Sequence, residues 1–345
     1  METDTDMEKK TDIKTEKETE NATETKTVKE KSDSLSITTV CPKCIVLSGA
    51  GMYGISFLGI LSKIDLADVR LYVGSSFGGI ISLFLYIGYS IADLYQIAIN
   101  IKFSEYQNPS LSNMMNKFGL DDYKYIDFVL KTVIDQKFSS DITFKQLYDK
   151  LNSSDLGHDR EFSQRELILT GSCINTGEPC YFNHQTTPNM PVLTAVKITM
   201  AYPGVFTPIQ YDNRLYADGA LFDFFPIDYT RQYIDREKIA GIDSILGITL
   251  ELGKYNIESF TSMGDYFYAL YIGSTKNALY PHTPEKYKKG TSEKGYDGKQ
   301  RSIRVIPLPI NIKNEFGSMN LALTTEQKKK LYNDGVNLAS THYAD

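Results

Sequence analysis

Two stretches near the start of the chain decide its fold: Ile45–Gly54, with the sequence IVLSGAGMYG, and Arg70–Gly79, with the sequence RLYVGSSFGG. In each, a short apolar run stops at small residues, and a further apolar segment follows. An apolar run that ends at a glycine turn is typical of a buried parallel strand, and the segment after it predicts a helix. Strand and helix thus alternate twice, which indicates an α/β domain with a mainly parallel sheet.

Similar patterns continue along the chain. Strands are expected at Ile45–Leu47, Val69–Val73, Leu167–Cys173, Cys180–Asn183, Ile245–Leu250 and Ile303–Ile306. Helices are expected at Tyr53–Ile64, from Gly79 to Tyr86, from Ile91 onward, at Val192–Met200 and at Thr325–Ala339. The last helix has Thr324 or Thr325 in position to cap it. Lys102–Ser163 is a mixed and mainly helical segment.

The composition limits what the chain can be. With 345 residues, of which 41% are hydrophobic and 23% charged, it can bury a sizeable core. The formal net charge of −6 argues against nucleic acid as the main partner. Residues 1–38 are almost entirely Thr, Glu, Lys and Asp, too polar to offset the entropy of folding. We therefore expect a disordered tail over 1–38 and one domain over 39–345.

Two features bear on membranes and on the cellular compartment. Leu71–Ala92 is uncharged and long enough to span a bilayer, but its glycines and serines favour a strand, a turn and a buried helix. No apolar signal segment opens the sequence. We expect an intracellular, cytoplasmic protein without a transmembrane segment, in contact with membranes at most at their surface.

The four cysteines are too few for a disulfide framework. Cys41 and Cys44 form a C-x-x-C pair, and together with Cys173 and Cys180 they make a zinc site formally possible. Six residues separate Cys173 from Cys180, which is a poor spacing for a zinc knuckle. Free thiols are favoured, and neither a metal nor another cofactor is expected.

The first glycine turn, Gly49–Gly54, has the spacing G-x-G-x-x-G that also marks dinucleotide-binding folds. A dinucleotide site needs a carboxylate at the end of the second strand, and this strand ends in Gly74-Ser75-Ser76 instead. The consecutive N–H groups of Ala50, Gly51 and Met52 have another use. At the start of a helix they form a concavity that suits a developing negative charge.

The second turn, Gly74–Gly78, has the G-x-S-x-G spacing of a nucleophile elbow. Glycines two residues on either side of Ser76 let the strand and helix backbones pass without Cβ clashes. The Ser76 Oγ then projects above the sheet at a helix N-terminus, where backbone N–H groups favour negative charge. Because both turns follow parallel strands, they are expected side by side at one edge of the sheet.

Two kinds of base could serve this serine. Asp218 lies in a tight Asp-Gly turn flanked by apolar residues, as a turn-forming or a catalytic carboxylate would. The order of Ser76, Asp218 and a later His282 or His342 would instead allow a triad of the α/β-hydrolase type. Both histidines lie in polar segments, which are unlike the strand that usually delivers a triad histidine.

Taken together, these motifs resemble the patatin-like phospholipase family, whose enzymes use a Ser–Asp dyad without histidine. The family's G-G-G-x-[KR]-G matches Gly49–Gly54, its G-x-S-x-G matches Gly74–Gly78, and its Asp-Gly-[Gly/Ala] matches Asp218-Gly219-Ala220. Three further stretches resemble the family near the aspartate: Thr187–Val192, Ala201–Pro208 and Phe225–Asp228. The motif core therefore covers 44–231, and 232–345 form the C-terminal part of the domain.

The resemblance implies a three-layer α/β/α fold with helices on both faces of a central, mainly parallel sheet. It implies Ser76 as nucleophile and Asp218 as general base, in a calcium-independent phospholipase A-type hydrolase that forms an acyl-serine. The implied oxyanion hole is Gly49, Ala50, Gly51 and Met52, and the implied supporting glycines are Gly54, Gly74, Gly78 and Gly219.

Two departures from the family pattern stand in the first turn, where Ala50 replaces the middle glycine and Tyr53 replaces the usual basic residue. Two alternatives stay open. One is a catalytically silent lipid- or protein-binding module with this fold, and the other is the triad esterase. Several family members are thought to need an activating protein, and the sequence identifies none.

A basic segment occurs late in the chain. Lys276–Arg304 contains eight basic residues against three acidic ones, with tyrosines interleaved. This composition predicts a flexible loop, and it would suit contact with an anionic membrane surface on which a lipid hydrolase must work.

Overall fold

The computed structural model describes residues 41–102, 109–153, 164–252, 269–270, 273, 290–310 and 323–342. All of them belong to the second of the two units into which the chain divides, 37–345. The tail expected over 1–38 lies outside the described residues. So do 276–289 of the expected basic loop, and with them His282.

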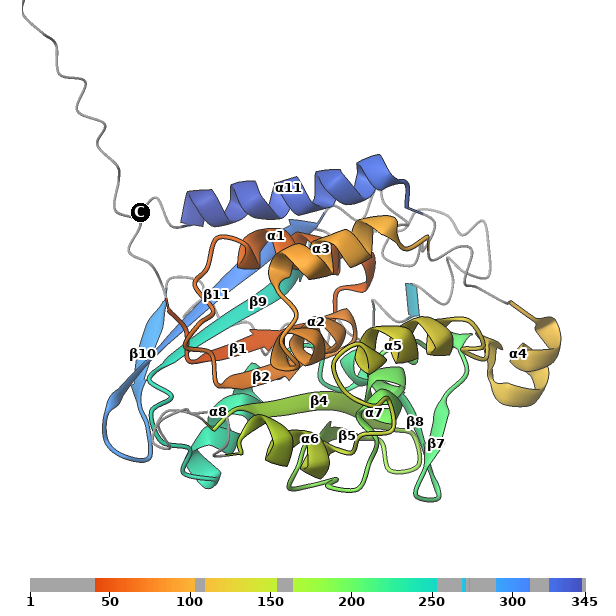
Figure 1. Cartoon of the computed structure of the whole chain (residues 1–345), viewed down its shortest axis with the longest axis horizontal. Coiled ribbons are helices and arrows are strands. Elements are labelled where there is room, and N and C mark those ends of the chain that lie inside the picture. The colour runs from red at the N-terminus through yellow and green to blue at the C-terminus, as the bar shows by residue number, and fades with distance from the viewer. Residues whose placement is uncertain are drawn as a thin grey trace, which may run out of the picture. The chain divides into compact units, whose positions relative to one another are not determined.

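Strands and helices alternate along the described chain (Figure 1). The strands are β1 (Cys44–Leu47), β2 (Leu71–Gly74), β3 (Gly119–Asp121), β4 (Glu166–Cys173), β5 (Glu178–Phe182), β6 (Gly204–Phe206), β7 (Ile209–Tyr211), β8 (Arg214–Asp218), β9 (Ser244–Leu252), β10 (Thr291–Lys294) and β11 (Gln300–Ile310). The α-helices are α1 (Gly54–Leu61), α2 (Phe77–Tyr86), α3 (Ile91–Asn100), α4 (Leu111–Lys117), α5 (Ile126–Asp135), α6 (Phe144–Leu151), α7 (Val192–Thr199), α8 (Ile227–Arg236) and α11 (Thr325–His342). Two 3-10 turns, η1 (Gly51–Tyr53) and η4 (Gly219–Leu221), follow β1 and β8.

Nine of the described strands form one sheet in the order β10-β11-β9-β1-β2-β4-β8-β7, with β5 also paired to β4. The central strands β11, β9, β1, β2 and β4 run parallel, and the antiparallel pairs lie at the two sides. All four residues of β1 are buried, because β1 lies in the middle of the sheet with neighbours on both edges. The predicted mainly parallel sheet is confirmed.

Helices cover both faces of the sheet, as β4 shows. Successive side chains of a strand point to opposite faces, so Gly171 and Glu166 face in opposite directions. A Cβ added to Gly171 would meet Ile198 of α7, whereas Glu166 accepts a hydrogen bond of 2.8 Å from Tyr233 of α8. The layer of α7 also holds α2, which packs on β1, β2 and β4. The predicted α/β/α arrangement is therefore confirmed (Figure 1).

Strand β11 is longer than the sequence predicted. It runs past Ile306 to Ile310 and includes Pro307 and Pro309. Strand β10 pairs only with Gln300–Ile303, so the later residues of β11 have β9 as their one partner among the described strands. Proline is tolerated there because its missing N–H falls on the unpaired side of an edge strand.

The described part of the expected basic loop is not a loop. Residues 291–294 form β10 and 300–304 begin β11, and the two strands make a hairpin. Arg301 is buried and contacts Asp235 (2.7 Å) and Glu293 (3.1 Å), and Glu293 also contacts Arg231. These carboxylates satisfy the Arg301 charge, so this cation is unavailable to a membrane.

Helix α11 closes the fold by packing along α1 (Figure 1). Its start is capped by Thr324, whose Oγ1 accepts a hydrogen bond from the Gln327 N–H at 3.2 Å, which resolves the choice between Thr324 and Thr325. The two helices approach through glycines. A Cβ at Gly335 would run into the Ser56 carbonyl, and a Cβ at Gly59 would run into the Tyr332 carbonyl.

Replacement of Gly335 by alanine tests this close approach. Helix propensity alone would stabilise the variant by up to about 1 kcal/mol. A clash between backbones should instead lower the free energy of unfolding by about 1–3 kcal/mol. Urea unfolding followed by circular dichroism measures the sign, with Lys329→Ala on the exposed side of α11 as the control. Stabilisation by Gly335→Ala would show that α1 and α11 are not in this contact.

Candidate active site

Ser76 occupies a sharp turn between β2 and α2. Its backbone has φ of 51° and ψ of −126°, a conformation that costs energy for any residue with a Cβ. Two glycines make the turn possible. A Cβ at Gly74 would collide with the Gly78 backbone, and a Cβ at Gly78 would collide with the carbonyls of Leu47 and Ser48. The elbow is thus pressed against the end of β1, beside the first glycine turn.

Asp218 contacts this serine directly. The Ser76 Oγ donates a hydrogen bond of 2.7 Å to Asp218 Oδ2, although 142 positions separate the two residues. Strand β8 delivers the carboxylate, because it pairs with β4 so that Asp218 lies opposite Gly171. Asp218 Oδ1 accepts a second hydrogen bond, 2.8 Å long, from the Ala220 N–H. Its own N–H donates to the Ala201 carbonyl at 2.9 Å.

The Asp218 carboxyl is almost completely buried, with 1% of its surface exposed. Burial disfavours the charged form and raises its pKa from 3.8 to about 7, while the hydrogen bonds from Ser76 and Ala220 oppose that rise. A carboxyl with a pKa near neutrality exchanges a proton readily at physiological pH. This property suits a general base and is unusual for a turn-forming aspartate.

The first glycine turn lies at the same edge of the sheet. Gly51 has φ of 49°, and Gly51 and Met52 open the 3-10 turn η1. The first N–H groups of a helix have no acceptor within it, so those of Gly51 and Met52 are suited to an external anion. Gly49 differs from the expectation, because its N–H donates to the Phe224 carbonyl at 2.9 Å. Gly49 therefore cannot serve as a donor in this state, which leaves Ala50, Gly51 and Met52.

The supporting glycines allow the elements around the site to approach closely. A Cβ at Gly54 would enter the Phe77 ring, so Gly54 lets η1 and the start of α2 lie together. A Cβ at Gly219 would collide with Thr170 of β4, so Gly219 lets the turn after Asp218 pack on the sheet. The structure thus gives a spatial reason for glycine at both positions.

Two further residues at the site were not found by sequence analysis. The Oγ1 of Thr199, at the end of α7, accepts a hydrogen bond of 2.8 Å from the Ser76 N–H and so orients the elbow. Tyr123 is buried, its hydroxyl donates to the Lys197 carbonyl at 3.3 Å, and burial followed by the nearby Asp218 charge raises the pKa of its phenol. Neither residue belongs to a motif, since only folding brings them to Ser76.

No histidine in the described part of the chain bridges this pair. The direct Ser76–Asp218 hydrogen bond leaves no place for an imidazole between the two groups. His342 is the last residue of α11. His184 stacks on Tyr148 of α6 with ring centroids 3.7 Å apart, and burial lowers its pKa to about 4. It follows β5, which runs away from the edge that holds Ser76.

The four cysteines do not converge on one site. Cys41 and Cys44 lie at the start of β1, whereas Cys173 is the last residue of β4. Because β1 and β4 run in the same direction, the two cysteine pairs lie at opposite edges of the sheet. Among the described residues, no group of three or more metal-binding side chains comes together.

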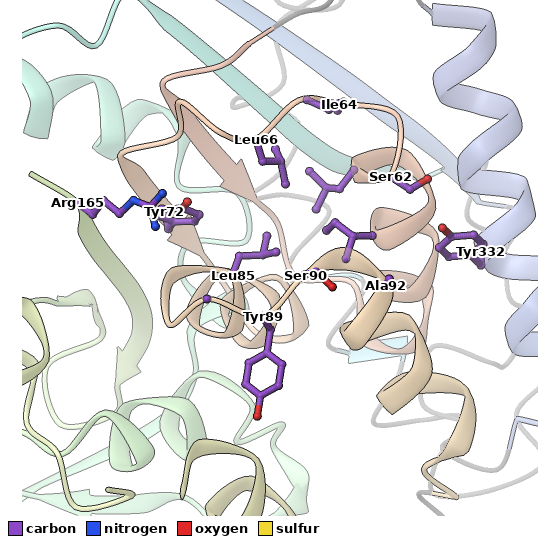
Figure 2. A pocket seen from close by; sticks show the side chains of 13 residues that line it. Ser62, Ile64, Leu66, Tyr72, Leu85, Tyr89, Ser90, Ala92, Arg165 and Tyr332 are labelled. Carbon is purple, nitrogen blue, oxygen red and sulfur yellow. The ribbon is translucent and has the colours of Figure 1, made fainter. Parts of the chain in front are cut away.

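A pocket of about 520 Å³ lies away from Ser76 (Figure 2). It is lined by the ends of α1 and α2 and the start of α3, with Tyr72 and Arg165 on one side. Ser76 precedes the first residue of α2, and a helix of this length spans about 15 Å. The pocket therefore lies at the opposite edge of the sheet and is separate from the Ser76–Asp218 site.

Comparison with known proteins agrees with the motifs. The sequence matches the patatin-like phospholipase family over residues 45–231, more than half of the chain. The chain belongs to the patatin-like phospholipase family, which makes it a lipid hydrolase at the level of the family.

Among individual relatives, "Probable lipid hydrolase 463L" of Invertebrate iridescent virus 6 is 29% identical to this chain over 233 residues. The aligned region covers 64% of this chain and 74% of the relative. It is 25% identical over 321 residues to "Uncharacterized protein R571" of Acanthamoeba polyphaga mimivirus, covering 89% of this chain and 95% of the relative. The crystal structure of VipD from Legionella pneumophila is similar with a TM-score of 0.48 and 15% identity, over 87% of this chain and 67% of VipD.

None of the helices in the described part of the chain combines the length and the apolar composition that a bilayer crossing requires. The Leu71–Ala92 segment contains β2, α2 and the start of α3, as the glycine and serine cluster indicated.

The raised pKa of Asp218 predicts a pH dependence of stability. The folded chain holds this proton up to a pKa of about 7, whereas the unfolded chain loses it near 3.8. The Asp218 carboxyl therefore stabilises the folded state most at low pH. This stabilisation is lost as the pH rises from about 4 to about 7. The loss amounts to about 4 kcal/mol in the free energy of unfolding. Urea unfolding at a series of pH values measures it.

The variant Asp218→Asn is the control, because its amide does not titrate. The wild-type free energy of unfolding should decline relative to that of Asp218→Asn between about pH 4 and 7. Parallel pH profiles for the two proteins would mean that Asp218 is ionised throughout this range.

Proposed function

We propose that this protein is a calcium-independent lipid acyl hydrolase of the phospholipase A type, with Ser76 as nucleophile and Asp218 as general base. The observation that carries the proposal is the 2.7 Å hydrogen bond between Ser76 Oγ and a buried carboxyl whose pKa lies near 7. A nucleophile and a base in direct contact need no third residue to relay the proton. The family membership supports an ester of a lipid as substrate.

In the first half of the reaction, Ser76 Oγ attacks the carbonyl carbon of an acyl ester, and its proton passes to Asp218 Oδ2. The carbonyl oxygen becomes negative and receives hydrogen bonds from the N–H groups of Ala50, Gly51 and Met52. A single donor of this kind contributes about 3–4 kcal/mol in comparable enzymes. The tetrahedral intermediate then expels the alcohol, a lysolipid or glycerol, which takes the proton from Asp218 as it leaves.

In the second half, a water molecule attacks the acyl-serine ester and gives its proton to Asp218. The same N–H groups bind the second oxyanion. Collapse of this intermediate releases the fatty acid, and the proton on Asp218 returns to Ser76 Oγ. Every proton and charge that moves is accounted for by groups of this chain, so we propose that calcium is not required.

The experiment is the release of fatty acid and lysolipid from mixed-acyl phospholipid vesicles, detected by mass spectrometry with calcium chelated. Wild type should release product. Ser76→Ala and Asp218→Asn should each reduce the rate by at least about 1,000-fold, because each removes one of two groups that act as a unit. The chain length of the released fatty acid identifies the position cleaved.

His282→Ala and His342→Ala are the controls that separate a dyad from a triad. Both variants should keep the wild-type rate. Loss of activity in either histidine variant would instead support a triad esterase. No release by wild type from any vesicle, with or without cell extract as a source of an activator, would support the silent binding module.

The rate should also depend on pH through Asp218. The base acts only when it is ionised, so kcat/KM should rise with pH and level off above an apparent pKa of about 7. Initial rates on a soluble short-chain ester across this range give the value. A pH profile that is flat from 5 to 8 would contradict the role of Asp218 as the titrating base.

A further inference from the structure

Helix α4 carries a stripe of apolar side chains that faces solvent. Leu111 and Met115 are each 79% exposed and Phe118 is 67% exposed. Leu111 and Met115 are four positions apart and so lie on one side of the helix, and Phe118 follows as its C-cap, with a left-handed backbone (φ of 64°). In a helix that packs on a core, a stripe of this kind would be buried. Here no residue of α4 is buried at all.

Two further apolar side chains are exposed at the start of the next helix. Tyr125, which precedes α5, is 41% exposed, and Phe128 in its first turn is 68% exposed. Five of the eight large hydrophobic side chains that are exposed in the described part of the chain thus fall between Leu111 and Phe128. We call the side chains of Leu111, Met115, Phe118, Tyr125 and Phe128 the apolar patch. Such a concentration marks an interaction surface.

The apolar patch is held next to the active site. Between its two helices, β3 pairs with β6, and the Thr207 N–H donates to the Asp121 carbonyl at 2.8 Å. Tyr123 stacks on Phe206 with centroids 5.0 Å apart and bonds to the carbonyl of Lys197 in α7. Helix α7 ends at Thr199, whose Oγ1 accepts a hydrogen bond from the Ser76 N–H. Figure 1 shows α4 and α5 at the edge of the sheet that also holds α7 and β8.

Lysines and carboxylates surround the patch. Lys117 is paired with Asp122 at 2.9 Å, and Lys131 and Lys197 are both paired with Asp127, at 2.9 and 2.8 Å. Lys124 lies 5.4 Å from the centre of the Tyr125 ring, which keeps a cation beside the aromatic surface.

We propose that the apolar patch is the surface by which the protein docks on a phospholipid bilayer, with the patch side chains among the acyl chains and Lys124 at the lipid phosphates. Amphipathic segments bind bilayers through these two contributions. The proposal rests on the proposed function, because docking here would present the Ser76 edge to the lipid. The described hairpin of 291–304 starts at the opposite edge of the sheet and has Arg301 paired with carboxylates.

The chain contains no tryptophan, so one introduced tryptophan reports on its own surroundings. Phe118→Trp should show a blue-shifted emission, quenched by brominated lipids, when vesicles of phosphatidylcholine with phosphatidylserine are added. Tyr296→Trp is the matched control, since Tyr296 is 41% exposed in the turn between β10 and β11. Its emission should not move. A shift at Tyr296 without one at Phe118 would overturn the proposal.

Binding is measured separately from hydrolysis. The variant Leu111→Ser/Met115→Ser/Phe118→Ser should reduce flotation with the same vesicles by at least about tenfold, because binding scales with buried apolar area. Ser76→Ala should float as wild type does. The triple variant should keep wild-type hydrolysis of a dissolved short-chain ester, which also shows that it is folded, and should lose activity on vesicles.

The outcomes distinguish the two proposals. If wild type hydrolyses neither the soluble ester nor the vesicles, yet Phe118→Trp enters the bilayer, the proposed function fails and the docking surface stands. Equal flotation of wild type and triple variant would overturn the docking surface. So would a wild-type dimer in gel filtration that the triple variant dissociates, because the patch would then bind a second copy of the chain.

Discussion

The hydrogen bond between Ser76 and Asp218 depends on three adjacent strands of the central sheet. The serine follows β2 and the aspartate ends β8, and β4 lies between these strands and pairs with both. A distance of 2.7 Å between two side-chain oxygens requires both strands to be fixed to a fraction of an ångström. Rigid strands achieve this, whereas two loops would not. The glycines of the elbow serve the same end by removing the Cβ atoms that would separate β1 from α2.

Burial of Asp218 raises its pKa, so that the carboxyl can exchange a proton with Ser76 near neutral pH. An exposed aspartate would be ionised at neutral pH and would be a weak base. Buried, and hydrogen-bonded by Ser76 Oγ and the Ala220 N–H, the carboxyl has a pKa of about 7 and can both accept and return a proton. The cost is a less stable protein at neutral pH, together with the strained backbone of Ser76. Both features lower the free energy of unfolding, and the packing of the sheet and helices around the site offsets this loss.

The two edges of the parallel sheet differ in character. The carboxyl edge brings together the elbow, the first glycine turn and, through α7 and β3, the apolar patch on α4 and α5. The amino edge holds the start of β1 with Cys44, the pocket beside Arg165 and the β10–β11 hairpin. Parallel strands produce this asymmetry, because all their carboxyl ends and the following turns lie on one side. Substrate and membrane contacts are therefore expected on the same side.

The sequence by itself determined the parallel α/β core, since apolar runs that stop at glycine turns have few other solutions, and it singled out Ser76 and Asp218 through short local motifs. Other features depended on tertiary context. Strand β11 passes through Pro307 and Pro309 because this part of it extends beyond its pairing with β10, and the Gly49 N–H donates to the Phe224 carbonyl. The sequence also did not predict the hydrogen bond between Thr199 and Ser76 or the exposure of the apolar side chains of α4. A motif records what the local backbone must do, but which distant groups meet, and which apolar face is left uncovered, is decided only when the strands are in register.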